Sequence, residues 1–259
     1  MGGETGPPEE RPSHHVELSA YCIDRTEVTV AMYRACSDAG GCKRASRQND
    51  WPPHVMTRSE RAAYDPLCNI REPEARASHP INCVDWGMAS LYCLWKNARL
   101  PTEAEWEFAA RGPDGRTFPW GDEDPRGGRV NACGLECVAW GKAFAITLKA
   151  LYLVDDGFPT TAPVGSFPEG NSVFGVADTG GNVSEWVDDA WSRYPEAVGS
   201  TLVDPRVAPT DTERRRVIRG GAWNSESPAW LRPTFRSSLR AETRSHGVGF
   251  RCAAGLAPR

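Results

Sequence analysis

The stretch RGGAWNSESPAW, residues 219–230, carries side chains whose types and spacing could do chemistry. A Gly-Gly turn precedes Trp223, the amide of Asn224 and the hydroxyl of Ser225, and such a turn can form the wall of a binding pocket. Ser225 lacks the G-x-S-x-G turn of hydrolase nucleophiles, and no histidine lies near it in the sequence. We therefore interpret Ser225 as a loop serine.

Arginines are concentrated in the same part of the chain. Nine arginines and only two acids, Glu226 and Glu242, lie between Arg214 and Arg251. A local excess of positive charge can attract anions, and arginine can hold a carboxylate, sulfate or phosphate through two parallel hydrogen bonds. A solvated basic face explains the same composition, so the sequence leaves both interpretations open.

The composition limits the class of protein. The chain has 259 residues, 40% hydrophobic and 25% charged, which suits one domain spanning 1–259. No apolar run reaches the ~18 residues of a membrane span. The first residues are polar, without the apolar core of a signal peptide. The net charge of −4 argues against nucleic acid as a partner.

Nine cysteines are many for a cytosolic protein and predict disulfides. A zinc site is less favoured, because no C-x-x-C occurs. One thiol must stay free, and Cys22, in the alternating stretch VELSAYCID, is predicted to be buried. The protein is expected to be secreted, periplasmic or on the cell surface. Three local disulfides are predicted: Cys36 with Cys42, Cys68 with Cys83, and Cys133 with Cys137.

Helical periodicity is found in three segments, 27–40, 85–98 and 101–112. Asp85 is the predicted N-cap of the second helix. In the third, Thr102 and Glu105 form a capping box and Gly112 ends the helix. After residue 112 the recurrence of Gly, Pro, Asn and Asp predicts loops attached to small sheets. The second helix is predicted to bury Met88, Leu91, Tyr92 and Trp95.

Several motifs, in their order along the chain, resemble those of the sulfatase-modifying-factor family. They are EVTVAMYRAC, HPINCVDWGMASLYCLWKNARLPTEAEWEFAARG, FPWGD, APVGSFPEGNSVFGVADTGGNVSEWVDD, RVIRGGAW and GVGFRCA. The family includes the formylglycine-generating enzyme, which oxidises a sulfatase cysteine to formylglycine. The resemblance implies an α+β, C-type-lectin-like fold with little regular secondary structure. It also implies a disulfide between Cys93 and Cys252, and it places MGG inside the first strand, so that a preceding segment is expected.

The resemblance further implies two calcium sites made of oxygen ligands. The first is expected to consist of the carboxylates of Asp178 and Glu185 and the carbonyls of Gly181 and Val183. The motif DTGGNVSEW supports this site independently, because a Gly-Gly turn between two acids directs carbonyls inward. The second, which rests mainly on the resemblance, is expected to consist of the side chains of Asn131 and Asp156 and the carbonyls of Ala132 and Phe158. Without metal, such acids would only form Asx turns.

The family's enzyme binds copper(I) through two cysteines that follow the Gly-Gly turn. Here the first position falls on Ser225 and the second within 228–230, and no cysteine lies between Cys137 and Cys252. A serine hydroxyl cannot replace a thiolate toward copper(I). Formylglycine synthesis and bound copper are therefore not expected. Two further positions of the family's pocket also differ, at Ser184 and Ala222.

Iron-dependent sulfoxide synthases of the same family use a histidine triad that an extra helical domain largely supplies. The histidines of this chain lack the H-x3-H-x-E spacing of that domain; they are His14, His15, His54, His79 and His246. We predict a non-catalytic, calcium-stabilised module that binds a protein or a small anionic ligand, within a larger protein. The alternative is a metal-dependent oxidoreductase using iron or copper.

The candidate ligand-binding residues combine aromatic and arginine side chains, which are enriched at binding hot spots. The competing interpretation is that both tryptophans pack in the core and that the arginines pair with Asp188, Asp189 or Glu185. The candidates are Trp223, Asn224, Ser225, Trp230, Arg232 and Arg236.

Overall fold

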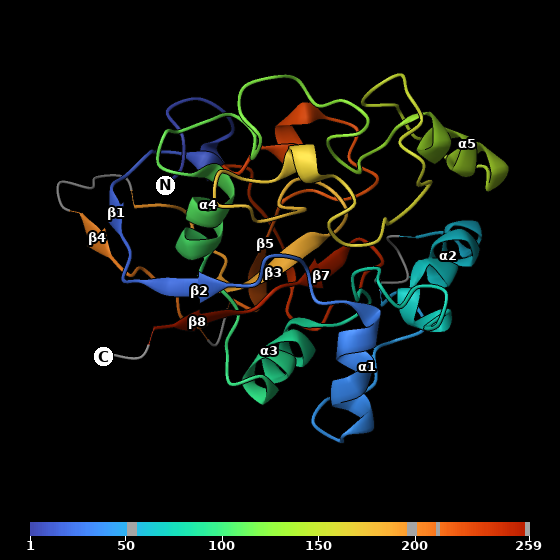
Figure 1. Cartoon of the computed structure of the whole chain (residues 1–259), viewed down its shortest axis with the longest axis horizontal. Coiled ribbons are helices and arrows are strands. Elements are labelled where there is room, and N and C mark those ends of the chain that lie inside the picture. Colours follow the sequence, from blue (N-terminus) through green and yellow to red (C-terminus); the bar gives the residue numbers. More distant parts are fainter. Residues whose placement is uncertain (51–55, 196–200, 211–212, 257–259) are drawn as a thin grey trace.

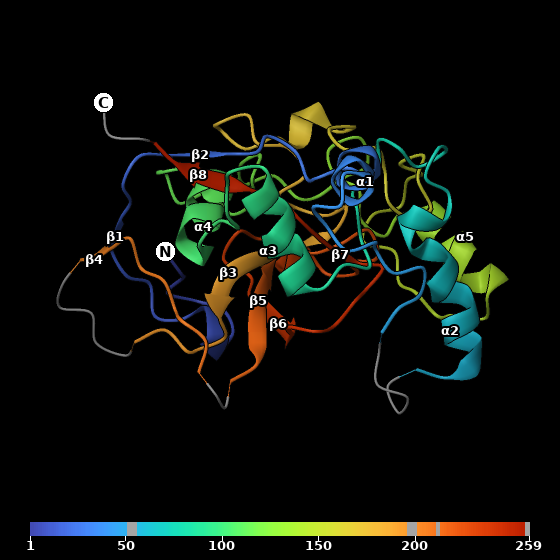
Figure 2. The ribbon, with the colours of Figure 1, turned by 90° about the horizontal axis from the view of Figure 1, so that it is seen from below.

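A four-stranded sheet lies at the centre of the fold, between helices (Figure 1, Figure 2). The computed structural model describes residues 1–50, 56–195, 201–210 and 213–256. Loops connect most elements, in agreement with the predicted α+β class with little regular secondary structure. The helices are α1 (Val30–Asp38), α2 (Arg58–Tyr64), α3 (Trp86–Trp95), α4 (Glu103–Arg111) and α5 (Leu135–Ala143). The strands are β1 (Val16–Glu17), β2 (Tyr21–Ile23), β3 (Ser184–Ala190), β4 (Leu202–Val203), β5 (Arg215–Arg219), β6 (Ser237–Arg240), β7 (Val248–Phe250) and β8 (Ala253–Gly255).

The central sheet runs in the order β6-β5-β3-β7, with β3 antiparallel to β5 and parallel to β7. Successive side chains of a strand point to opposite faces. Trp186 of β3 therefore packs with α1 and α3, whereas Val187 packs against Trp106 of α4. The pairs β1–β4 and β2–β8 form two small sheets beside this centre. No helix among the described residues has the length and apolar character needed to cross a bilayer.

The three predicted helices form as α1, α3 and α4, and each begins at a side-chain cap. Thr29, Asp85 and Thr102 each accept a hydrogen bond from the backbone N–H three residues further on. In α4 Glu105 completes the capping box, and Gly112 follows the last turn with φ +73°. Local sequence was therefore sufficient to place these three helices.

The predicted inward face of α3 is partly wrong. Met88 and Tyr92 are buried, but Leu91 is 44% exposed and Trp95 is 41% exposed. The buried side of α3 is instead the side that carries Cys93, whose disulfide partner Cys252 lies near the end of the chain. Because α3 is apolar on most sides, periodicity could not select the buried face.

The sequence patterns do not anticipate α2 and α5, which lie close together at one end of the molecule (Figure 1). Helix α2 is short, although Thr57 and Glu60 form a capping box that marks its start. Helix α5 has no side-chain N-cap and carries apolar residues around its circumference, so it shows no amphipathic pattern. Helix α5 is therefore an exception to the loops and small sheets expected after residue 112, whereas the short strands β3 to β8 agree with that expectation.

All four disulfides join the cysteines that the sequence and the resemblance pair. The ninth cysteine, Cys22, is free but exposed, so its predicted burial is wrong. It lies on β2, which pairs with β8 in a small peripheral sheet, and it faces away from the half-buried Tyr21 and Ile23. The alternation of the strand separates its two faces but does not say which one meets the core.

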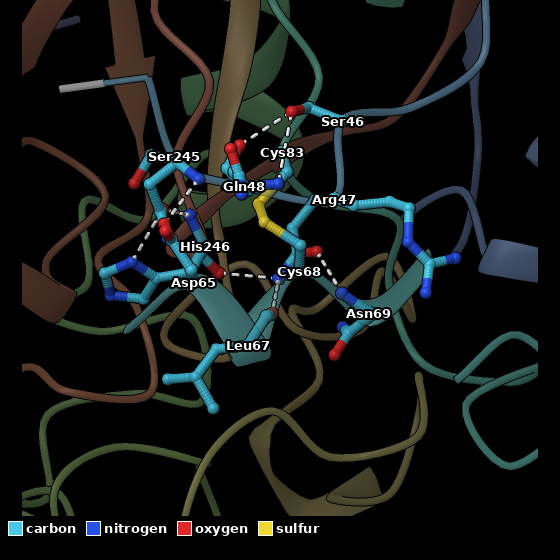
Figure 3. Close-up of a disulfide and its surroundings, with 12 residues drawn as sticks. Ser46, Arg47, Gln48, Asp65, Leu67, Cys68, Asn69, Cys83, Ser245 and His246 are labelled. Carbon is cyan, nitrogen blue, oxygen red and sulfur yellow. Dashed lines mark hydrogen bonds between the residues drawn. A yellow bond between two sulfur atoms is a disulfide. The ribbon is translucent and has the colours of Figure 1, made fainter. Parts of the chain in front are cut away.

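The Cys68–Cys83 disulfide lies beside a buried histidine, His246 (Figure 3). Its Nδ1 is 3.0 Å from Oδ1 of Asn49, and its ring stacks on Tyr64 with centroids 4.5 Å apart. Burial lowers the pKa of His246 to about 4. The neutral imidazole is thus part of the packed interior.

We expect the disulfide Cys93–Cys252 to stabilise the fold more than Cys36–Cys42 does. Their cysteines are 159 and 6 residues apart, and loop-closure entropy gives about 5 and about 2 kcal/mol respectively. The measurement is urea unfolding of C93S/C252S, with C36S/C42S as the matched control. Equal losses for the two double variants would contradict this ranking.

Stability should also fall as the pH is lowered from about 6.5 to about 4. The buried site disfavours the protonated ring of His246, whereas the unfolded chain takes up the proton near the ordinary value of 6.5. As the pH falls from about 6.5 to about 4, the protein therefore loses up to about 3 kcal/mol of its free energy of unfolding. Urea unfolding at pH 7 and pH 5 should show a smaller pH dependence for H246Q than for wild type. The exposed-site control H15Q should retain the wild-type dependence.

Candidate functional site

The turn at 178–185 meets the Gly-Gly loop in space. The N–H of Gly181 donates to the carbonyl of Gly220 at 2.7 Å, and the N–H of Trp223 donates to that of Asn182 at 2.8 Å. Gly181 has φ +96°, and a Cβ there would lie 2.2 Å from the carbonyl oxygen of Asn131. Glycine is therefore required, and this close approach brings the two predicted calcium segments together.

Three carboxylates and one guanidinium are buried beside this turn: Glu27, Asp178, Glu185 and Arg251. Arg251 holds Glu185 through two hydrogen bonds of 2.7 Å. One guanidinium against three carboxylates leaves two negative charges uncompensated. Burial, reinforced by Asp178 and Glu185, raises the pKa of Glu27 well above its usual value, and burial also raises that of Asp178. A cation near Asp178 and Glu27 would relieve this repulsion.

The turn at 178–185 carries several oxygen atoms of the kind that a hard cation prefers. Within the described residues, the carbonyls of Gly181 and Val183 receive no hydrogen bond. Oδ2 of Asp178 accepts the N–H of Gly165 at 2.6 Å. Glu185 already accepts three hydrogen bonds, two from Arg251 and one from the indole N–H of Trp106. All four predicted residues thus bring oxygen atoms to this region, with those of Glu185 the most occupied, and Glu27 is an unpredicted carboxylate beside them.

The two halves of the second predicted site lie near each other in the fold, although they are far apart in sequence. Asn131 is buried, and its Nδ2 donates to the carbonyl of Thr160 at 3.0 Å, which leaves Oδ1 without a partner. Oδ1 of Asp156 accepts the N–H of Phe158 at 2.9 Å. The N–H and carbonyl of Ala132 both contact a tyrosine hydroxyl that also binds Asp156. Burial raises the pKa of Asp156 to about 6.

Neither site is built from acids alone. In the described part of the chain, no group of three or more His, Cys, Asp or Glu side chains is arranged to hold a metal. A cation at either position would therefore depend on amide and carbonyl oxygens as well, which is typical of calcium.

Ser225 is buried within the Gly-Gly loop, with 3% of its surface exposed. Its hydroxyl accepts the N–H of Ala222 at 3.0 Å, and its own N–H donates to the carbonyl of Ala222 at 2.9 Å. Its carbonyl accepts the N–H of Cys133 at 3.2 Å, next to the Cys133–Cys137 disulfide. Ser184 donates its hydroxyl to the carbonyl of Gly221 at 3.0 Å. Both hydroxyls thus stabilise the loop, as expected for a loop serine.

Trp223 is a core residue. Its ring meets Trp140 of α5 in a T-shaped contact at 5.3 Å and lies 5.8 Å from His246. Tyr64 of α2 belongs to the same apolar cluster, together with the Cys133–Cys137 disulfide. The two unpredicted helices therefore pack aromatic side chains around the Gly-Gly loop.

The six candidate ligand-binding residues do not form one open surface. Arg236 is buried and forms two hydrogen bonds, of 2.6 and 2.7 Å, with Glu103. Arg232 is paired with Glu10 at 2.8 Å. Of the set, Trp230 is exposed, Asn224 is half-buried, and Trp223 and Ser225 are buried. The competing interpretation is right for the packing of Trp223 but not for Trp230, and the two arginines do pair with acids, although with Glu10 and Glu103 and not with Asp188, Asp189 or Glu185.

The histidines are spread over the fold. His14 packs edge-on against Tyr194, and Nδ1 of His79 lies 3.1 Å from the hydroxyl of Thr161. His54 lies outside the described residues.

No sequence signal pointed to Glu27, because its carboxylate comes close to Asp178 only through the tertiary fold.

The comparisons with known proteins agree with the motifs. A sequence profile of the family described as "Sulfatase-modifying factor enzyme 1-like domain" matches residues 1–256. A formylglycine-generating enzyme from Streptomyces coelicolor is 35% identical over 94% of this chain and 81% of its own length. An inactive Cα-formylglycine-generating enzyme 2 from Bos taurus is 34% identical over 73% of this chain and 54% of its own length.

The solved structure of PvdO from Pseudomonas aeruginosa resembles this fold with a TM-score of 0.65. It is 25% identical in sequence, and the match covers 96% of this chain and 86% of that one. The expected α+β, C-type-lectin-like fold is thus confirmed. The chain belongs to the sulfatase-modifying-factor family.

Proposed function

We propose that this chain is a non-catalytic member of the family that serves as a binding module. The state of its cysteines carries the proposal. Eight of the nine are held in disulfides, and the free one, Cys22, lies exposed on β2. Copper(I) chemistry of the family's kind needs two thiolates at one point. The Gly-Gly loop offers the hydroxyl of Ser225 and the ring of Trp230 instead.

The burial of Ser225 supports the same proposal. A substrate cysteine would have to reach this position, yet the hydroxyl is enclosed and occupied by the N–H of Ala222. Trp223, two residues before it in the loop, is buried against Trp140. The loop is therefore packed as part of the core, and that a relative is named an inactive enzyme is consistent with this.

Calcium is proposed as the structural ion of this module. The residues fit it at the first site, where Asp178, Gly181 and Val183 offer oxygens in a buried region that holds more carboxylates than cationic side chains. They also fit at the second, where Oδ1 of Asn131 has no partner. In both places the ion would supply positive charge and link segments distant in sequence. Four disulfides further favour a secreted, periplasmic or cell-surface protein.

Trp230 is the proposed contact residue for a partner. It is exposed at the end of the loop that Ser225 closes, and exposed tryptophan is enriched at binding hot spots. The arginines of the loop region are not free for an anion, because Arg232 and Arg236 already hold carboxylates. We therefore favour a protein partner over a small anionic ligand.

The first test is oxidation of a sulfatase-type cysteine peptide under oxygen with added copper(I). We expect the peptide to stay unmodified, as followed by mass spectrometry, because no second thiolate is available. The variant S225C should be equally inactive, since Trp230 and Ser184 remain. Oxidised peptide from the wild-type protein with copper or iron would instead support the oxidoreductase alternative.

The second test is removal of calcium. EGTA should lower the melting temperature by about 5–10 °C and added calcium should restore it, because an ion bound only to the folded state stabilises that state. D178N should show a smaller calcium response, whereas the exposed control D124N should keep the wild-type one. Melting curves that are identical with EGTA and with calcium would refute calcium stabilisation.

A further inference from the structure

Two buried oxygen atoms around Asp156 have no hydrogen-bond partner among the described residues: Oδ1 of Asn131 and Oε1 of Glu136. The orientation of the Asn131 amide is fixed, because its Nδ2 donates to the carbonyl of Thr160, which can only accept. No hydrogen-bond donor among the described residues therefore occupies the lone pairs of Oδ1. Oxygen atoms left in this state are available to a cation.

Glu136 lies in the first turn of α5, next to Asp156. Its Oε2 accepts the backbone N–H of Asp156 at 3.1 Å. Among the described residues neither carboxylate takes part in an ion pair. Two neighbouring carboxylates without a cationic side chain repel each other. The disulfide Cys133–Cys137 brackets Glu136 and holds it in this place.

Tyr152 aligns the remaining oxygen atoms. Its hydroxyl lies 2.6 Å from Oδ2 of Asp156, 2.9 Å from the carbonyl of Val130 and 3.2 Å from that of Ala132, and it accepts the N–H of Ala132 at 3.0 Å. One phenol proton can serve only one of these acceptors, and the shortest contact is to Asp156. The carbonyl of Ala132 thus keeps acceptor capacity beside Asp156.

We infer that Glu136 is an additional acidic ligand of the cation site formed by Asn131, Ala132 and Asp156. The inference rests on the proposed binding of calcium, the ion that this all-oxygen set suits. A second carboxylate increases the affinity of such a site, because affinity follows the number of charged ligands. The competing role for Glu136 is purely structural: an acidic side chain in the first turn of α5 interacts favourably with the helix dipole.

The test compares E136Q with D155N. D155N also removes one negative charge, but from the exposed residue that directly precedes Asp156. Calcium titration calorimetry and native mass spectrometry of the full chain should find two ions in wild type. E136Q should bind one of them about tenfold more weakly, whereas D155N should remain close to wild type. In EGTA, E136Q should melt at or above the wild-type temperature, because the repulsion with Asp156 is removed.

The outcomes separate the two roles. Unchanged calcium affinity in E136Q overturns the inference, and so does a melting temperature lowered equally with and without calcium, which a structural Glu136 would give. The variant D178N tests the first calcium site in the same titrations. If D178N loses an ion and E136Q loses no affinity, calcium stabilisation stands and Glu136 is not a ligand. If only E136Q weakens binding, Glu136 is a ligand and the first site is wrong.

Discussion

The buried ion pair between Arg251 and Glu185 connects most parts of this structure. Both side chains are fully buried. The guanidinium of Arg251 also donates to the carbonyls of residues 24–25 and of Ala177, so it joins the N-terminal segment, the turn before 178 and the last strands. Trp106 of α4 donates to the same carboxylate. Removing one partner of such a pair leaves an uncompensated buried charge, which typically costs ~3–5 kcal/mol.

Further charged side chains lie on the same face of the sheet, where Glu185 of β3 and Arg219 of β5 are directly paired. Arg219 of β5 pairs with Glu103 and Glu107 of α4, and Arg236 shares Glu103 while its guanidinium lies 3.8 Å from the ring centroid of Tyr194. The chain thus uses arginine where many proteins use apolar packing. The arginine-rich composition of the last third is explained in large part by these internal pairs. A scaffold of this kind is specific, because each guanidinium requires carboxylates in a fixed geometry.

The Gly-Gly loop is held in place largely through its backbone. Backbone hydrogen bonds join the loop to Gly181 and Asn182, in addition to the bond that the hydroxyl of Ser225 accepts within the loop. Aromatic residues from α2 and α5 then pack around the loop. Main-chain contacts and aromatic packing thus account for much of the position of this loop.

The sequence by itself determined the family, the α+β class, the capped helices and the four disulfides. These depend on local signals, such as Thr102 with Glu105, or on motifs specific enough to recognise. It could not give the buried face of α3, the exposure of Cys22 or the existence of α5, because apolar residues on several sides do not reveal which side meets the core.

Only the tertiary structure decided which polar side chains are available. Arg232 and Arg236 look like ligand-binding residues in the sequence, but the fold brings Glu10 and Glu103 to them from far along the chain. The same holds for Glu27 beside Asp178. Whether a charge is free or neutralised depends on neighbours distant in sequence, and long-range contacts of that kind leave no periodicity for sequence analysis to detect.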